Sequence, residues 1–232
     1  MNIIGIISSP RKNGNTAALV REAMKGAAAE GVTTQEIFLT DYNIHFCTGC
    51  SACLSAGICP LQDDFEQLKQ RLYKADGVIL GSPTYAASPN AIMKNFIERM
   101  GMFERFTSAG FGGKYVVGMS TAGSMGAKKV ANDLTELVKG SVIRRGYVSG
   151  TLGVSVKGGT VNDIPNALTQ AHALGKRLAQ DIRSKKSYAW QNLFGRMMNR
   201  MFIKPTFVNI AKTQKDGRLR AVYQTLQQQG VC

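Results

Sequence analysis

The sequence predicts an α/β fold in which helices cover both faces of a parallel sheet. Five short apolar segments alternate with longer segments whose apolar residues repeat at helical spacing. The segment 77–81, GVILG, is apolar throughout, as expected for a strand that is buried on both faces. Because right-handed crossovers leave few topologies open to such a chain, we expect a doubly wound sheet.

The expected strands and helices alternate along the chain. Strands are expected at residues 2–7, 33–39, 77–81, 114–120 and 148–156. Helices are expected at about 16–30, from Asp63 through Tyr73, and at about 90–102, 128–145 and 165–182. In doubly wound sheets, ligands bind beyond the carboxyl ends of the strands. Functional residues should therefore lie in the loops after the first, third and fourth strands.

Charge is distributed unevenly along the chain, which has 232 residues and a formal net charge of +14. From residue 184 to the end, nine Lys and Arg residues stand against a single acid, Asp216. This change in composition predicts a boundary near residues 184–187. We expect a ligand-binding domain over 1–183 and a basic extension over 184–232.

The basic extension contains an amphipathic segment. Its apolar residues fall at 190, 193, 194, 197, 198, 201 and 202, which is the spacing of one helix face. We expect a helix that packs on its own domain or on a neighbouring subunit. Contact with a membrane surface is an alternative for such a cationic helix. Nucleic acid is not expected as a partner, because basic charge without a reading module is a weak footprint.

The N-terminus is typical of a cytoplasmic protein. The segment MNIIGIISSP has no basic region, and its apolar run is too short for a signal peptide. No apolar run approaches the roughly 20 residues that span a bilayer. In a reducing compartment, paired disulfides are not expected, so clustered cysteines indicate metal binding or redox chemistry.

The loop after the first strand, SSPRKNGNT at 8–16, opens directly into a helix. A helix N-terminus carries about half a positive charge and offers free backbone N–H groups. With its small polar residues and two cations, Arg11 and Lys12, the loop predicts a phosphate site. It matches neither the Walker A nor the GxGxxG pattern. The alternative is an ordinary turn with Asn15 or Thr16 as the N-cap.

Two further loops complete a crevice at the same edge. The loop after the third strand, 82–90, is stiffened by Pro83 and Pro89 and offers the flat face of Tyr85. The loop after the fourth strand, 121–126, has small residues that let a ligand approach the backbone. Together the three loops predict a site that holds a phosphate at one end and a planar ring at the other.

The motifs SPRKNGNT (9–16), GSPTY (81–85), MKNFIER (93–99) and TAGS (121–124) resemble flavodoxin-fold, FMN-dependent NAD(P)H oxidoreductases. The resemblance covers residues 1–183 and implies a five-stranded parallel sheet of order 2-1-3-4-5 with FMN at the switch point. It departs from the family at Ser8, where glycine is usual. By resemblance, the FMN phosphate should be held by Ser9, Arg11, Asn13, Asn15 and Thr16. The isoalloxazine should be bordered by Pro83, Thr84 and Tyr85 on one side and by Thr121, Ala122 and Gly123 on the other.

Four cysteines lie together in the loop 47–59, with the spacing Cx2Cx2Cx5CP. Three cysteines at such intervals present thiolates to a [4Fe–4S] cluster in ferredoxins, and Gly57 gives the chain room to bring Cys59 back to the same cluster. Free or reversibly oxidised thiols and a zinc site are alternatives. A zinc site usually needs a second ligand pair, and His45 and His172 are the only histidines.

The cysteine motif also resembles that of the iron–sulfur flavoproteins, a branch of the same family. The resemblance implies four ligands to a [4Fe–4S] cluster, namely Cys47, Cys50, Cys53 and Cys59. The basic extension resembles the C-terminal regions of some family members, which assist subunit assembly. A homo-oligomer, either a dimer or a tetramer, is therefore expected.

These observations predict an FMN-dependent oxidoreductase that transfers electrons from NAD(P)H, or from a reduced protein donor, to an acceptor. A cluster accepts electrons singly, whereas a hydride donor delivers two, and FMN can handle both. No side chain is expected as a catalytic acid or base, because flavin hydride transfer requires none. The alternative is a non-enzymatic, flavodoxin-like electron carrier. Such carriers tend to be acidic and short, so the basic, extended chain favours the enzyme.

Overall fold

The computed structural model describes residues 1–188, 190–191 and 193–232. Its central sheet has five parallel strands in the order β2-β1-β3-β5-β6. The strands are β1 (Asn2–Ile7), β2 (Thr33–Phe38), β3 (Gly77–Tyr85), β5 (Tyr115–Ala122) and β6 (Tyr147–Ser155). A short strand, β4 (Ser88–Pro89), pairs antiparallel with the end of β3. Since β4 is only a hairpin arm, the order 2-1-3-4-5 expected for the five main strands is confirmed, and the fold is flavodoxin-like.

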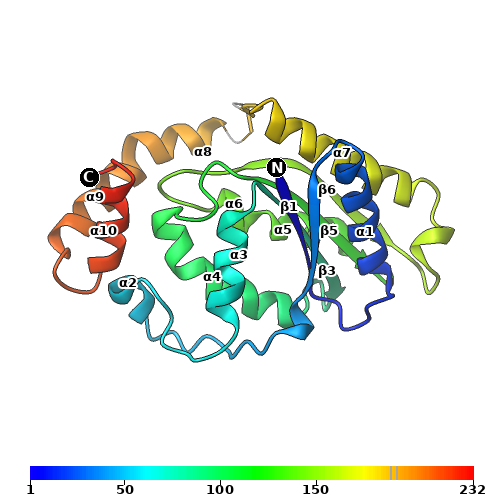
Figure 1. Ribbon diagram of the computed structural model, residues 1–232, viewed down its shortest axis with the longest axis horizontal. Coiled ribbons are helices and arrows are strands. Elements are labelled where there is room, and N and C mark those ends of the chain that lie inside the picture. Colours follow the sequence, from blue (N-terminus) through cyan, green and yellow to red (C-terminus); the bar gives the residue numbers. More distant parts are fainter. Residues whose placement is uncertain (189, 192) are drawn as a thin grey trace.

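Helices cover both faces of the sheet (Figure 1). One face carries α1 (Asn15–Ala28) and α7 (Ala167–Arg183), over a core that includes Ile3 and Ile7 of β1. The other face carries α3 (Phe65–Lys74), α4 (Ala91–Thr107), α5 (Ala127–Leu134) and α6 (Glu136–Lys139), over Ile4 and Ile6. Alternate residues of a strand point to opposite faces. The apolar run of β1 therefore fills both cores, as a doubly covered strand requires.

The helices α1 and α7 approach each other closely because glycines lie at their contact. A Cβ atom on Gly175 of α7 would lie 1.7 Å from the carbonyl oxygen of Ala23, and one on Gly26 of α1 would lie 2.0 Å from the carbonyl oxygen of His172. Neither position leaves room for a side chain, since backbone cannot move aside as a rotamer can. This contact fixes α1, and with it the loop that precedes α1.

The helix expected over 128–145 is shorter than predicted. α5 ends at Leu134, α6 ends at Lys139, and residues 141–146 are not helical. This segment bonds to the end of α4 instead: Val142 N–H donates to the Arg105 carbonyl at 2.8 Å, and Arg144 N–H donates to the Ser108 hydroxyl at 2.9 Å. Partners far away in the sequence thus replace the intrahelical bonds.

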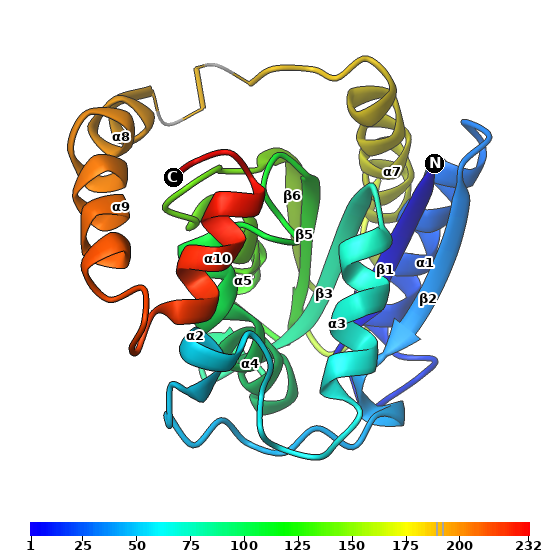
Figure 2. The same cartoon turned by 60° about the vertical axis from the view of Figure 1, so that its left-hand side comes forward.

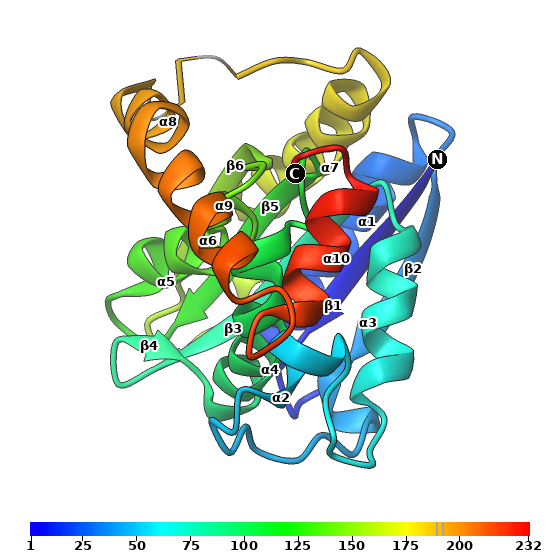
Figure 3. The ribbon, with the colours of Figure 1, turned by 90° about the vertical axis from the view of Figure 1, so that its left-hand side faces the viewer.

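Beyond α7, the chain forms an extension that reaches over to the α4 side of the sheet (Figures 2 and 3). It contains α8 (Leu193–Met198), a π-helical turn η3 (Asn199–Ile203), α9 (Lys204–Thr213) and α10 (Arg220–Gln228). The helix expected over 190–202 is therefore helical from Leu193, while Trp190 lies in a turn; residue 192 lies outside the described residues. Two short 3-10 helices, η1 (Leu39–Asp41) and η2 (Val161–Asp163), occur in the main domain.

The end of the extension packs on the cysteine loop. The loop contains a short helix, α2 (Ala52–Ala56), and α10 contacts both α2 and α4. A third apolar cluster forms there, from Leu54, Ile143, Ala211, Leu219, Val222 and Leu226. The apolar face of α8, by contrast, is exposed in this chain, with Phe194 70% accessible. Among the described residues, no helix has both the length and the apolar character to cross a membrane.

Candidate functional site

Three loops meet at the carboxyl edge of the central strands. They follow β1, β3 and β5, which are neighbours in the sheet. The hydroxyls of Thr16 and Thr121 lie 2.7 Å apart, joining the first loop to the third. The Asn90 side-chain amide donates to the Ser8 carbonyl at 2.8 Å, joining the second loop to the first. The structure thus brings together the three loops predicted to form one crevice.

The loop between β1 and α1 is folded around its own backbone. Ser9 Oγ accepts a hydrogen bond from the Arg11 N–H at 3.2 Å, and the Gly14 N–H donates to the Arg11 carbonyl at 3.0 Å. Gly14, rather than Asn15 or Thr16, is the N-cap of α1, and no side chain caps the helix. An uncapped N-terminus leaves backbone N–H groups directed at the crevice, as an anion site needs.

The two asparagines of the loop have structural partners. Asn15 donates to the Gly159 carbonyl at 3.2 Å and accepts from the Val161 N–H at 3.0 Å, which ties the loop to the segment after β6. Asn13 accepts a hydrogen bond from Arg21 of α1 at 3.4 Å. Ser9 and Thr16 are buried, and Arg11 is exposed. The side chains of Asn13 and Asn15 thus shape the loop, while Arg11 is the cation that can reach a ligand.

The loop after β3 forms a hairpin that the sequence did not predict. Ala86 and Ala87 at its tip have φ values of +47° and +57°, where a residue with a side chain costs roughly 1–2 kcal/mol. Two such residues in succession make the tight turn that β-hairpins favour. The turn holds Tyr85 at the rim, 49% exposed. Glycine and asparagine are the residues that usually indicate this turn, so the two alanines did not predict it.

Opposite this hairpin, the loop after β5 leaves open space. A Cβ atom added to Gly123 would meet nothing within 4 Å. Gly126, which has a φ of +91°, begins α5 and packs close to Thr84 of the hairpin. The Thr84 hydroxyl lies 2.8 Å from that of Ser120, so the second and third loops are joined at their base. A flat ligand could therefore lie between Tyr85 and Gly123.

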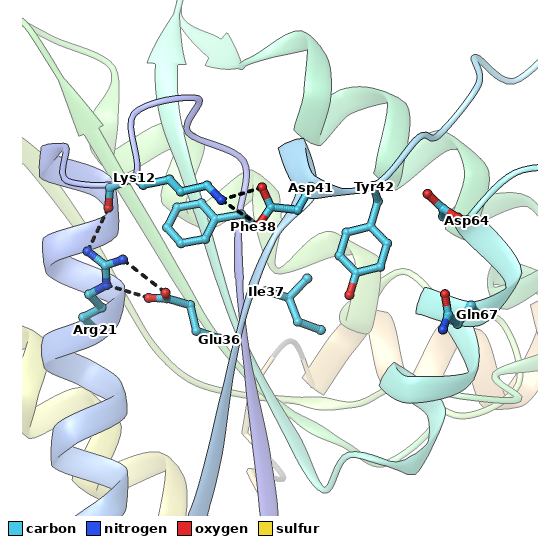
Figure 4. Close-up of a pocket in the computed structure, with 9 residues that line it drawn as sticks. All are labelled: Lys12, Arg21, Glu36, Ile37, Phe38, Asp41, Tyr42, Asp64 and Gln67. Carbon is cyan, nitrogen blue, oxygen red and sulfur yellow. Dashed lines mark hydrogen bonds and ion pairs between the residues drawn. The ribbon is translucent and has the colours of Figure 1, made fainter.

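A hollow of about 530 Å³ lies on the outer side of the loop 8–16, beside the edge strand β2. Figure 4 shows two ion pairs in its lining, Lys12 with Asp41 and Arg21 with Glu36, beside the apolar side chains of Ile37 and Phe38. Lys12 lies 2.7 Å from Asp41, and Arg21 lies 2.6 Å from Glu36. Arg21 also donates to the Lys12 carbonyl at 2.8 Å. These contacts thus support the loop 8–16 on its outer side.

The four clustered cysteines line one cavity. Cys47, Cys50, Cys53 and Cys59 surround it together with Phe65 and Arg99, and all four are free thiols. The helix α2 presents Cys53 and ends at Gly57, whose φ of +79° turns the chain back toward Cys59. In the described ranges of the chain, no three His, Cys, Asp or Glu side chains are placed to hold a metal ion.

The electrostatics of this cavity disfavour four bare thiolates. Burial raises the pKa of Cys53, and the charges of Cys59, Cys50 and Cys47 raise it further. Cys50 differs, because hydrogen bonds from the Ala52 N–H and the Thr48 hydroxyl lower its pKa. Cys50 is exposed and is the more acidic of the two thiols. A cationic group bound among the four sulfurs would remove their mutual repulsion.

The sheet order and the three joined loops define the class of the protein: a flavodoxin-like α/β protein whose loops meet at the switch point of the sheet. Residues 1–154 match the family model described as NADPH-dependent FMN reductase. The chain belongs to this family of FMN-dependent flavoprotein oxidoreductases.

Two relatives from archaea are similar over most of their length. An iron–sulfur flavoprotein of Archaeoglobus fulgidus is 35% identical over 188 residues, covering 80% of this chain and 82% of its own. An iron–sulfur flavoprotein of Methanocaldococcus jannaschii is 34% identical over 194 residues, covering 79% of this chain and 98% of its own. The aligned part of this chain therefore covers most of the length of each relative.

A solved structure supports the fold. The NAD(P)H:quinone oxidoreductase of Methanothermobacter marburgensis superposes with a TM-score of 0.60 at 15% identity, over 77% of this chain and 96% of its own. At this identity, the likeness concerns the fold alone.

Proposed function

We propose that FMN binds non-covalently in the crevice between the three loops. The observation that carries the proposal is the uncapped N-terminus of α1, which lies where the Thr16 and Thr121 hydroxyls meet. Arg11, Ser9 and Thr16 would hold the phosphate together with the backbone of residues 13–15. The side chains of Asn13 and Asn15 would keep that backbone in place through Arg21 and the segment after β6.

The flavin ring would lie between the two remaining loops. Pro83, Thr84 and Tyr85 would border one side, and Thr121, Ala122 and Gly123 would border the other. The open space at Gly123 and the exposed face of Tyr85 fit a planar group. When bound, FMN accepts a hydride and returns electrons singly or in pairs; the protein supplies binding, orientation and charge.

We propose that the electron donor is NAD(P)H or a reduced protein, and that the protein works as an enzyme in the reducing cytoplasm. The test is the oxidation of NADPH and of NADH by the FMN-loaded protein. Turnover with either supports an enzyme. FMN binding without turnover would favour a carrier that docks on other redox proteins.

We propose further that Cys47, Cys50, Cys53 and Cys59 hold a [4Fe–4S] cluster. In such a cluster each thiolate binds a different iron, so the ligands surround a group rather than a single ion. The donor set fits, since four thiols line one cavity and the repulsion between their thiolate charges would be relieved by a cationic centre. Held by these four residues, such a cluster would supply one-electron transfer.

The cluster is tested by anaerobic purification followed by an absorption spectrum and by iron and sulfide counts. Cys50→Ser should remove the broad iron–sulfur absorbance while FMN stays bound. Cys232→Ser is the matched control, because Cys232 lies outside the cavity. Zinc in place of iron and sulfide, or four titratable thiols without metal, would contradict the cluster.

We also propose that the protein is a homo-oligomer, a dimer or tetramer, assembled through the exposed face of α8. This face carries Leu193, Phe194 and Met197, which are 51%, 70% and 48% accessible in the single chain. Phe194→Asp should reduce the sedimentation coefficient to that of a monomer. A monomeric wild type that binds anionic vesicles through this face would favour the membrane-surface alternative.

A further inference from the structure

An ion pair lies buried beneath the cysteine loop. The side chains of Arg99, in α4, and Asp63 are each 1% exposed, and two contacts join them: Nη1 to Oδ2 at 2.6 Å and Nη2 to Oδ1 at 3.0 Å. Burying two charges is costly unless the pair has good geometry and further hydrogen bonds. The pair has both, and its remaining hydrogen bonds all go to the ends of one loop.

The pair ties the two ends of the cysteine loop together. Arg99 Nη1 donates to the His45 carbonyl at 2.7 Å, and Asp63 accepts from the His45 N–H at 2.8 Å. His45 thus has both its backbone groups held, two residues before the first cysteine. On the far side of the loop, Asp63 also accepts from the Phe65 N–H at 3.1 Å. One ion pair therefore fixes the entry and the exit of the segment that carries all four thiols.

The guanidinium lies over the Phe65 ring, beside the cavity of the four thiols. Its central carbon lies 4.4 Å from the centroid of the Phe65 ring, which fixes its plane. Arg99 lines the same cavity as the four cysteines. Its Nε–H is buried, and across the part of the chain that the structure describes it has no hydrogen-bond partner in good geometry. Because leaving a buried donor unpaired is costly, this Nε–H points to a sulfur of the cavity as its acceptor once the thiols hold a ligand.

Of the four cysteines, Cys59 packs against the apolar cluster that contains Phe65, the ring over which the guanidinium lies. Arg99 stays charged under all conditions of interest. It therefore offers a fixed positive charge to this one ligand position.

We propose that Arg99 is a positioning residue for the cysteine loop. Together with Asp63 it holds the two ends of the loop, and it donates an N–H···S hydrogen bond to the thiolate of Cys59. The inference rests on the proposed cluster. Hydrogen bonds to the sulfurs and local charge set the potential of an iron–sulfur cluster. A donor and a positive charge both stabilise the reduced, more negative cluster, so Arg99 raises its potential.

The test is Arg99→Lys in the full chain, reconstituted anaerobically with iron and sulfide. Lysine keeps the charge that pairs with Asp63 but lacks the Nε donor and the planar fork. We expect FMN binding as in the wild type, a cluster potential shifted to more negative values in a redox titration, and faster loss of iron to a chelator. Mutating a residue that hydrogen-bonds to a metal ligand typically changes metal affinity by roughly 10- to 100-fold. Arg105→Lys is the matched control, because Arg105 is exposed on the same helix.

Two failures are distinguishable. If the wild type takes up no iron, the proposed cluster is wrong; the positioning role is then judged by hydrogen exchange of the loop in the FMN-bound protein, which Arg99→Met should accelerate relative to Arg105→Met. If the wild type holds a cluster but Arg99→Lys leaves its potential, its EPR spectrum and its iron retention unchanged, the hydrogen bond to Cys59 is refuted. Equal exchange in Arg99→Met and Arg105→Met would refute the closure of the loop.

Discussion

The phosphate loop after β1 and the cysteine loop 47–59 carry the two candidate cofactor sites, but they are held in different ways. The first lies between buried strands: Ser9 and Thr16 are 4% and 2% exposed, and neighbouring loops bond to it directly. The second lies over the surface, where Phe46 is 74% exposed. It is tied at its ends by Arg99 and Asp63 and covered by α10.

This difference shows which of the two candidate sites is shaped by the central sheet and its helices. The loop 8–16 takes its shape from the sheet, from α1 and from the segment after β6, so its conformation is fixed by the fold itself. The cysteine loop depends on elements that are far away in the sequence, including the C-terminal extension. We therefore expect changes in α10 to disturb the thiols and changes near α1 to disturb the flavin, each without affecting the other.

The largest expected effect is that of Leu226→Ala in α10. Leu226 is fully buried against the cluster that includes Leu54 of α2. Truncating a buried leucine costs about 3–5 kcal/mol, so α10 should no longer hold α2. We expect faster labelling of Cys53 by thiol reagents and unchanged FMN affinity. Ile210→Ala, at an exposed position in α9, is the control. Loss of FMN affinity in Leu226→Ala would show that the two sites are coupled.

The opposite experiment is Gly175→Ala at the contact of α7 with α1. The added methyl group would lie 1.7 Å from the Ala23 carbonyl oxygen, so α1 must shift. Overpacking costs about 1–3 kcal/mol, which lowers the melting temperature by roughly 2–4 °C per kcal/mol for a chain of this size. FMN affinity should fall, while thiol labelling stays as in the wild type. Gly101→Ala, whose methyl group would meet nothing within 4 Å, should leave stability equal or raised.

Thr16→Val tests the contact between loops within the crevice itself. The change removes the partner of the buried Thr121 hydroxyl, and we expect FMN affinity to fall roughly tenfold, measured by flavin fluorescence. The double variant Thr16→Val/Thr121→Val removes both hydroxyls and should recover thermal stability, since a matched apolar pair leaves no unsatisfied group. FMN affinity should remain low in the double variant. Full recovery of affinity would mean that the Thr16 hydroxyl does not contact the phosphate.

The same comparison explains how much of the molecule could be predicted from the sequence. Buried strands and the helices between them follow from local periodicity, and the strand order followed from the resemblance to a family. The hairpin at Ala86 and Ala87 could not be predicted, because its turn has no glycine or asparagine. The end of α6 at Lys139 depends on bonds to α4 that are distant in sequence.

The candidate sites likewise divide into features that local sequence patterns predict and features that depend on distant contacts. The three loops meet as expected, although β3 and β5 continue to Tyr85 and Ala122, past the strand ends expected at 81 and 120. The four cysteines share one cavity, and their role as ligands stays a prediction. The roles of Arg99 and Asp63 were not predicted, since no local pattern links them to His45, which lies 54 positions before Arg99. Nor did the amphipathic stripe of the extension reveal that α10, rather than α8, covers the cysteine loop.

The smallest expected effect is a pH dependence at the opposite edge of the sheet, which serves as a reference for both loops. Lys114, just before β5, donates to the Leu72 and Tyr73 carbonyls at 2.8 and 2.7 Å. Burial lowers its pKa to about 8, while the nearby carboxylate of Glu104 acts in the opposite direction. Between about pH 8 and its ordinary pKa of 10.5, the unfolded chain therefore binds the proton that the folded chain has lost.

Stability consequently rises with pH in this window, because the state that binds more protons is disfavoured as pH increases. From pH 8 to 9.5 the gain should be at most about 1 kcal/mol after allowance for solvent screening. Lys114→Gln keeps a hydrogen-bond donor but cannot titrate, so the difference between its unfolding curves and those of the wild type isolates this amine. Because Lys114 precedes β5 and does not line the cysteine cavity, FMN affinity and thiol labelling in Lys114→Gln should match the wild type. A wild-type curve parallel to that of the variant over this range would show that the amine titrates normally in the folded protein.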